Sequence, residues 1–174
     1  SAYSVAPKIF TELGAKVIPI AVEPDGININ EKCGSTSPQL LQETVIATRS
    51  TMGIAFDGDG DRLLVADSKG NILDGDDLLY TLILSNITRK KEDFLSTGVV
   101  GTLMTNKALE VFLKEQEIGF TRTDVGDKFI LEELIRKNWS LGGEPSGHII
   151  CLDSTTTGDA IVAALSVLDS IKEF

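Results

Sequence analysis

The sequence predicts an α/β protein of two layered domains with mixed sheets. Short apolar runs of strand length alternate with segments whose apolar residues recur at helical spacing, which is the pattern of α/β layers. Glycine, aspartate and asparagine mark the turns between these segments. The length of 174 residues allows one or two domains that each bury a core, and 42% hydrophobic with 24% charged residues is an ordinary globular composition.

The first part of the chain is expected to end near residue 73. Helical spacing, turn signals and β-rich runs define its elements. Pro19 suits an edge position in its first strand. Because a helix comes first, a strand that feeds this helix is expected to precede residue 1. The expected elements are a helix at 7–13, a strand at 17–22, a helix at 39–48, and strands at 54–56, 62–67 and 72–73.

A domain boundary is expected near residue 74, which divides the chain into a metal-binding domain of residues 1–73 and a sugar-binding domain of residues 74–174. The acidic residues at 74–77 suit the positive end of a new helix. The expected elements that follow are a helix at 78–88, a strand at 98–103, a helix at 106–117, a strand at 119–123, a helix at 129–137, a strand at 149–152 and a helix that residues 155–159 open.

The most informative stretch is the acidic loop after residue 56. Asp57, Asp59 and Asp61 alternate with glycines, which permit a tight curl and a close approach of the backbone to an ion. Three carboxylates that converge on one point need a cation between them. Hard oxygen donors favour Mg²⁺ or Ca²⁺, and open coordination positions favour Mg²⁺ bridged to a phosphate. Arg62 adds a planar fork that suits phosphate oxygens.

Three other interpretations of this acidic loop compete. A solvated acidic turn is the plainest of them. An EF-hand requires Gly at its sixth position and Glu at its twelfth, where this chain has Arg62 and Ser68, so that alternative fails. A haloacid-dehalogenase-like phosphatase also follows a strand with an Asp-x-Asp loop and would make Asp57 the nucleophile. Gly60 and Asp61 depart from the residues usual there, and this phosphatase stays open as the alternative enzyme.

A second loop, at residues 144–148, groups Glu144, Ser146 and the one histidine of the chain, His148. A carboxylate and a hydroxyl together accept from and donate to the hydroxyls of a sugar, and histidine titrates near neutral pH. A structural hydrogen-bonding histidine is the competing interpretation, although the loop setting favours function. Lys128 stands at a strand-to-helix junction, where phosphate groups are readily held, and an exposed surface lysine is its alternative.

Charge and cysteine usage exclude several classes of protein. A net charge of −10 without a basic cluster argues against nucleic acid or an anionic membrane as a partner. No apolar stretch approaches the length of a membrane span, and the start lacks a signal-peptide pattern. Cys33 and Cys151 fit no metal or redox spacing and are expected to be reduced, as in a cytoplasmic protein. The oligomeric state, a homodimer included, is left open.

The two loops together resemble the metal loop and the sugar loop of the α-D-phosphohexomutases. The first reads Asp-Gly-Asp-Gly-Asp-Arg at 57–62, and the second reads Gly-Glu-Pro-Ser-Gly-His at 143–148. Motifs at 28–36, 125–128 and 155–159 are similar to those of the bacterial branch that acts on glucosamine phosphates. The resemblance extends over essentially the whole chain. It departs mildly from the family pattern at Pro145, a position that varies in the family, and at Lys128, which is often Arg.

The resemblance implies a fragment of a four-domain phosphohexomutase that covers most of the second domain and all of the third. The implied reaction interconverts glucosamine 6-phosphate and glucosamine 1-phosphate through a phosphoserine enzyme and a bisphosphorylated sugar, toward peptidoglycan precursors. The serine loop and a phosphate-binding loop belong to the other two domains. The implied partners are therefore the phosphosugar and the remaining domains of the same enzyme, and this chain alone is expected to be inactive.

The resemblance also implies roles for individual residues. The three aspartates would hold Mg²⁺, and the sugar loop would bind hydroxyls through Glu144, Ser146 and His148. The implied catalytic residues are Arg62, Lys128 and His148, the last as a proton carrier. A metal- and sugar-phosphate-binding module without turnover of its own is the alternative outside the enzymes.

Overall fold

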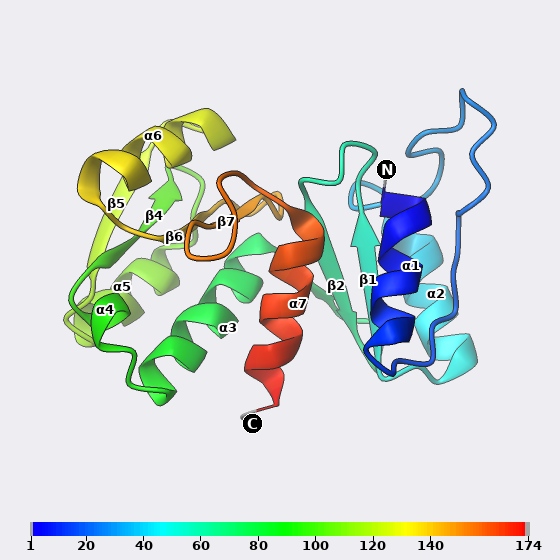
Figure 1. Cartoon of the computed structure of the whole chain (residues 1–174), viewed down its shortest axis with the longest axis horizontal. Helices are drawn as coiled ribbons and strands as arrows, with labels where there is room; N and C mark the ends of the chain where they lie inside the picture. Colours follow the sequence, from blue (N-terminus) through cyan, green and yellow to red (C-terminus); the bar gives the residue numbers. More distant parts are fainter. Residues whose placement is uncertain (1, 173–174) are drawn as a thin grey trace.

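Two α/β halves lie side by side in a computed structural model of the chain, which describes residues 2–172 (Figure 1). Each half has its own sheet with helices packed against it, as the alternation of elements predicted. One hydrophobic core cluster nevertheless runs through both halves. The α/β class with two layered sheets is confirmed.

The first half is a three-stranded antiparallel sheet in the order β1-β2-β3. Its helices cover opposite faces: Phe10 of α1 stacks on Phe56, and Leu41 and Val45 of α2 pack against Ala55. Phe56 and Leu63 are paired, so the acidic loop is the connection of a β-hairpin. The elements are α1 (Ala2–Glu12), α2 (Gln39–Thr48), β1 (Met52–Phe56), β2 (Leu63–Asp67) and β3 (Ile72–Leu73).

Residues 17–22 form no strand, so the strand expected there is wrong. Val17 packs against the main core and Ile20 against the α2 cluster, which accounts for the apolar pattern. Pro19 lacks an N–H group, and Ala21 adopts a left-handed φ of 53°, both of which work against a sheet ladder. Burial alone, without ladder hydrogen bonds, explains the strand-like sequence.

The second half has a mixed sheet in the order β5-β4-β6-β7. Strand β4 runs parallel to both β5 and β6, while β6 and β7 are antiparallel. Residues 144–148 therefore connect a second hairpin. Helix α4 and strand β6 were not predicted. The elements are α3 (Gly75–Thr88), α4 (Glu92–Leu95), β4 (Gly98–Thr102), α5 (Lys107–Glu115), β5 (Gly119–Thr123), α6 (Asp127–Lys137), β6 (Leu141–Gly143), β7 (Ile149–Cys151) and α7 (Ala160–Ile171).

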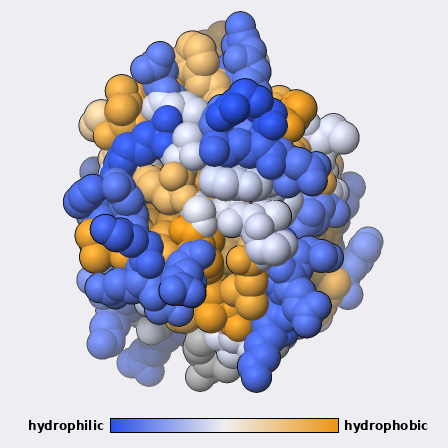
Figure 2. Space-filling model, turned by 90° about the vertical axis from the view of Figure 1, so that its left-hand side faces the viewer, coloured by the Kyte–Doolittle hydropathy of each residue, from blue (hydrophilic) through white to orange (hydrophobic). Residues whose placement is uncertain are grey.

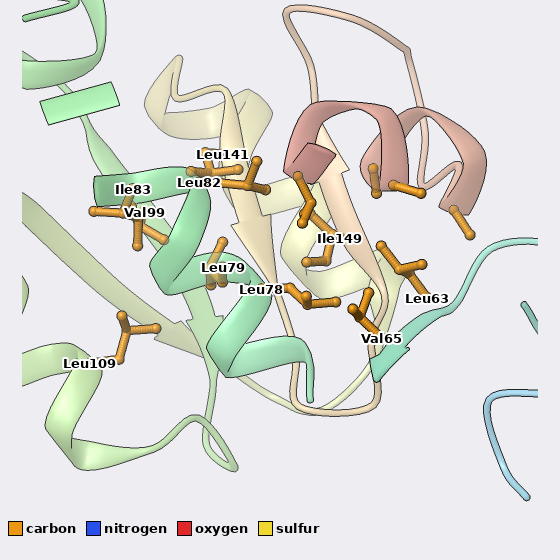
Figure 3. Packing of buried hydrophobic residues seen from close by; sticks show 14 of the residues in the cluster. Leu63, Val65, Leu78, Leu79, Leu82, Ile83, Val99, Leu109, Leu141 and Ile149 are labelled. Atoms are coloured by element: carbon orange, nitrogen blue, oxygen red, sulfur yellow. The ribbon is translucent and has the colours of Figure 1, made fainter. Parts of the chain in front are cut away.

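The core that joins the halves positions the two hairpin loops. Leu63 and Val65 of β2 lie opposite Leu78 of α3 and Ile149 of β7, all at most 1% exposed (Figure 3). Helix α7 lies between α3 and the first sheet and adds Val167 to the same core (Figure 1). Each such aliphatic side chain contributes about 1.5–3 kcal/mol when fully buried. This shared core holds the loops at the ends of β1 and β6 near one another.

The outer face of the second half is mainly hydrophilic, with smaller groups of hydrophobic side chains between the charged ones (Figure 2). This face includes α5, α6 and the free edge of β5. No helix within residues 2–172 combines the length and the apolar character needed to cross a bilayer.

Candidate metal and sugar site

The acidic loop is closed by its own first aspartate. Asp57 Oδ1 accepts hydrogen bonds from the backbone amides of Gly60, Asp61 and Arg62 at 3.0, 3.2 and 3.3 Å. Gly60 has a φ of +77°, which suits glycine at this bend. One carboxylate oxygen therefore organises the turn, and no described residue bonds to the other oxygen, Oδ2.

Asp57, Asp59 and Asp61 form the one cluster of potential metal ligands found within residues 2–172. One ligand oxygen from each lies within 4.8 Å of the others, and the first and third are half-buried. Asp61 Oδ1 is buried without a hydrogen-bond partner among the described residues. A buried carboxylate oxygen without a donor is costly unless a cation meets it. The donor set fits a hard divalent ion such as Mg²⁺.

The irregular segment of residues 28–37 packs against the acidic loop and the end of β1. A Cβ at Gly34 would lie 2.9 Å from the carbonyl oxygen of Phe56, and a Cβ at Gly58 would collide with the side chain of Ile29. Glycine is therefore required at position 34, where its neighbour is backbone and its φ is +78°. At Gly58 the neighbour is the end of an exposed side chain, which can move. Only a motif resemblance pointed to this segment in the sequence, because close backbone packing leaves no periodic signal.

The second loop is a tight turn between β6 and β7. The amide of Glu144 donates to the carbonyl of His148 at 3.1 Å, and the amide of Gly147 donates to the carbonyl of Glu144 at 3.0 Å. Ser146 Oγ donates to Glu144 Oε1 at 2.7 Å, and Glu144 is only 7% exposed. No backbone amide in the described chain bonds to this carboxylate. Its other oxygen, Oε2, is left for a further donor.

Backbone hydrogen bonds join the two loops across the halves. The amide of Leu63 donates to the carbonyl of Gly147 at 2.9 Å, and Arg62 and His148 form an isolated antiparallel bridge. Within the second half, the amide of Gly75, at the start of α3, donates to the carbonyl of Pro145 at 3.1 Å and anchors the same turn. The aspartate loop and the Glu144 loop, predicted separately, thus lie side by side.

A side-chain bond also joins the loops. His148 Nδ1 lies 3.0 Å from Asp61 Oδ2, and His148 is 3% exposed. Arg62 is half-buried, and its Nε has no hydrogen-bond partner among the described residues. Arg62 and His148 therefore lie between the carboxylate cluster and the Glu144 turn.

Lys128 is not brought into contact with either loop. It lies in the first turn of α6, its side chain is 75% exposed, and its nearest acidic partner is Glu132 of the same helix at 3.8 Å. Gly126 caps this helix without a side-chain hydrogen bond. The amide of Phe129 donates to the carbonyl of Gly126 at 3.1 Å, so the amides of Asp127 and Lys128 are the ones of the first turn that remain available to an anion.

Sequence reasoning missed two features beside the site. Gly158 lies against the ring of His148, and a Cβ there would collide with Nε2. Asp76 follows Gly75, and burial raises the pKa of its carboxyl group, while the amide of Asn106 donates to Oδ2 at 2.7 Å and opposes the rise. The glycine before Asp159, which caps α7, was the sequence signal for the first feature. Asp76 belongs to the acidic run at 74–77, but nothing in that run indicates that its side chain is buried.

Family models and relatives match the chain over nearly its whole length. The description Phosphoglucomutase/phosphomannomutase, alpha/beta/alpha domain III matches residues 74–173, and domain II of the same description matches residues 1–70. A phosphoglucosamine mutase of Legionella pneumophila (strain Corby) is 53% identical over 95% of this chain and 36% of its own length. One of Neisseria meningitidis serogroup C (strain 053442) is 51% identical over 99% of this chain and 38% of its own length.

Solved structures show the same fold. A phosphoglucomutase/phosphomannomutase family protein of Burkholderia thailandensis superposes with a TM-score of 0.80 at 24% identity, over 98% of this chain and 38% of that one. The chain thus spans little more than a third of the length of the relatives it matches.

Proposed function

Since the chain belongs to the phosphoglucomutase/phosphomannomutase family, we propose that it is the metal- and sugar-binding part of a longer enzyme that interconverts glucosamine 6-phosphate and glucosamine 1-phosphate. The observation that best supports this proposal is that hydrogen bonds join the aspartate loop of one half to the Glu144–Ser146 turn of the other. Relatives named phosphoglucosamine mutase, more than half identical to this chain, support the choice of amino sugar. The reaction proceeds through a phosphoserine enzyme and a bisphosphorylated sugar, toward peptidoglycan precursors.

The division into domains is part of this proposal. Residues 1–73 form the metal-binding domain and residues 74–174 the sugar-binding domain. The ranges of the two family models, 1–70 and 74–173, support this boundary, as does the capping box that Asp74 and Asp77 form at the start of α3. Free thiols at Cys33 and Cys151 support a reducing, cytoplasmic compartment.

Asp57, Asp59 and Asp61 would hold Mg²⁺. Asp57 would offer Oδ2, since Oδ1 closes the loop, and Asp61 would offer its buried Oδ1. When bound, Mg²⁺ neutralises charge on a phosphoryl group in transfer. Arg62, with a donor left free, would contact phosphate oxygens beside the metal ligands.

Glu144 and Ser146 would orient the sugar. Glu144 Oε2 accepts from a sugar hydroxyl, while the Oε1 bond to Ser146 holds the carboxylate in one rotamer. A carboxylate would repel a phosphate group. The turn of residues 144–148 would therefore face the sugar ring, and the phosphates would lie nearer Mg²⁺, Arg62 and Lys128. The Lys128 side chain and the backbone amides of Asp127 and Lys128 would hold a phosphate of the sugar.

The test is turnover with and without the remaining domains. The complete enzyme should convert glucosamine 6-phosphate in the presence of Mg²⁺ and a trace of bisphosphate, and residues 1–174 alone should not, because the reacting groups come from several domains. Phosphoenzyme trapping adds a second readout. Label on a serine outside this chain supports the mutase, whereas label on Asp57 would instead support a dehalogenase-like phosphatase. Turnover by residues 1–174 alone would contradict the domain assignment.

A further inference from the structure

We infer that Asp76 is a positioning residue for the turn of residues 144–148, which it holds in place through the first turn of helix α3. The inference rests on the proposed role of that turn in binding the sugar. It starts from two neighbouring residues that contact two different loops. Gly75 contacts the turn of residues 144–148, and Asp76 contacts the loop of residues 103–106 between β4 and α5.

The start of α3 fixes the middle of the turn. The amide of Gly75 donates to the carbonyl of Pro145 at 3.1 Å. Because Pro145 stands between Glu144 and Ser146 in the chain, this hydrogen bond holds the backbone between the two side chains that are proposed to bind the sugar. The packing is close: a Cβ at Gly75 would collide with the carbonyl of Glu144 and lie 2.7 Å from the amide nitrogen of Gly147. A displacement of the start of α3 would therefore displace the turn.

Asp76 ties the start of α3 to the loop that follows β4. Its Oδ2 accepts from the amide of Asn106 at 2.7 Å, although the two residues stand 30 positions apart. Strands β4 and β6 are parallel neighbours, so this loop and the turn of residues 144–148, which follows β6, emerge at the same edge of the sheet. Open α/β sheets bind their ligands at that edge. Asp76 thus connects two loops that border the same part of the molecule.

The loop of residues 103–106 is a firm support because hydrogen bonds hold its backbone to the sheet. Arg122 of β5 donates from Nη1 to the carbonyls of Thr102 and Thr105 at 2.9 and 2.8 Å. Thr105 Oγ1 also accepts from the amide of Thr102 at 2.9 Å. These bonds fasten the loop to β4 and β5, and Asp76 extends this fixed position to the start of α3.

Stability alone does not account for a carboxylate at position 76. Asp76 is 9% exposed, and its Oδ1 is buried without a hydrogen-bond partner among the described residues. A buried carboxylate oxygen without a donor costs free energy. An apolar residue would avoid that cost, but it could not accept from the amide of Asn106. The carboxylate is therefore explained by the link that it makes to the loop.

Two substitutions of Asp76 separate its hydrogen bond from its charge. Asp76→Asn keeps an oxygen that accepts from the amide of Asn106, and Asp76→Ala removes this acceptor. In the complete enzyme, we expect Asp76→Ala to raise KM for glucosamine 6-phosphate by about 3- to 30-fold and to change kcat less, because the turn binds the sugar before and during the reaction. Asp76→Asn should stay within about twofold of wild type. Mn²⁺ affinity should be unchanged in both variants, because the Asp76 side chain has no hydrogen bond to the acidic loop within residues 2–172.

A double mutant tests whether Asp76 acts through the turn. Residues that act through one another are not additive, so Asp76→Ala should raise KM less in the Glu144→Gln background than in the wild type. An effect of full size in both backgrounds, or an unchanged KM in Asp76→Ala, would overturn the positioning role and leave the proposed function standing. Wild-type kcat/KM in Glu144→Gln alone would instead remove the turn from the sugar site.

Ile130→Val is the control for a loss of stability without a change at the turn. Ile130 is fully buried in a separate core cluster of the second half, so the variant should melt a few degrees lower while KM stays at the wild-type value. A rise in KM as large as that of Asp76→Ala would show that lower stability explains both, and the inference would fail. If Asp76→Ala does not fold, Asp76→Ser takes its place, because serine suits the first turn of a helix and is too short to reach the amide of Asn106.

Discussion

The amide of Leu63 donates a hydrogen bond across 2.9 Å to the carbonyl of Gly147, which places the first residue of β2 directly against the turn of residues 144–148. Gly147 has a φ of +92°, and a Cβ there would collide with the carbonyl of Leu63. The glycine is therefore required twice, by its own backbone conformation and by the strand it touches. This contact joins the two halves through main-chain atoms.

Gly147→Ala should consequently destabilise the protein strongly. We expect a loss of at least about 3 kcal/mol in the free energy of unfolding, because left-handed strain of about 1–3 kcal/mol is added to a backbone collision. Gly60→Ala is the matched control, since Gly60 has a φ of +77° but open space around its Cα. It should lose about 1–2 kcal/mol. Equal losses in urea denaturation would show that the contact with Leu63 contributes nothing.

Asp59→Asn should weaken divalent-cation binding while leaving the fold intact. Asp59 is the exposed member of the cluster, and its carboxylate has no hydrogen bond to another described residue. Its charge is therefore available to a cation and is not needed for the loop. Mn²⁺ titration of residues 1–174, where binding is expected to be weak without a phosphoserine ligand, should show a clear loss in the variant. Equal Mn²⁺ binding by both proteins, with equal melting temperatures, would refute the metal site.

Local sequence signals predicted most of the elements. The helix expected at 39–48 agrees with α2 to the residue, and the strands expected at 62–67 and 72–73 correspond to β2 and β3. The exceptions have physical causes. Strand β6 contains two glycines of its three residues, so its burial leaves no β-branched pattern. Residues 17–22 are apolar because they pack on two clusters, without a strand beside them.

The sequence could indicate which residues belong to the candidate site, but not how those residues are arranged in space. Asp57, Asp59 and Asp61 converge within one hairpin loop, so their spacing alone carried the prediction. The contact of His148 with Asp61 depends on how two halves pack, and no local pattern encodes it. Close backbone contacts, such as that of Gly158 with the imidazole of His148, are marked in the sequence by no more than a single glycine.

Asp76→Asn should change how stability depends on pH. Burial raises the folded pKa of Asp76 above its ordinary value of 3.8, so the folded protein holds this proton more tightly than the unfolded chain. The free energy of unfolding therefore falls as the pH rises through the interval above 3.8, and stays lower beyond it. Asparagine has no such titration and still accepts from the amide of Asn106.

The measurement is the difference in melting temperature between Asp76→Asn and wild type. The melting temperature of the variant should rise relative to that of the wild type between about pH 4 and about pH 7, because only the wild type loses stability when Asp76 ionises. Groups that do not interact with Asp76 titrate alike in both proteins and cancel in the difference; the neighbouring Asp74 and Asp77 do interact with it. A difference that stays constant over this range would show that Asp76 ionises in the folded state as freely as in the unfolded chain.

Glu144→Gln should reduce turnover of the complete enzyme without reducing its stability. Gln retains an Oε1 that accepts from Ser146 Oγ, so the internal bond of 2.7 Å can persist. What disappears is the negative charge on the acceptor of a sugar hydroxyl. A hydrogen bond to a charged partner contributes about 1.5–3 kcal/mol, so kcat/KM should fall by about ten- to a hundredfold. Mn²⁺ affinity should stay at the wild-type value, since no aspartate of the metal loop touches this side chain.

The competing explanation is that Glu144 stabilises its own turn. A carboxylate that caps backbone amides contributes about 1 kcal/mol of stability, and its loss would lower the melting temperature. The described structure gives Glu144 no such amide partner, and Ser146 Oγ is the donor it receives. Early melting of Glu144→Gln with full kcat/KM would therefore remove this residue from the sugar site. Ser146→Ala separates the two roles further: it frees Glu144 Oε1, so the carboxylate loses its fixed rotamer and KM for the sugar phosphate should rise while Mn²⁺ affinity is unchanged.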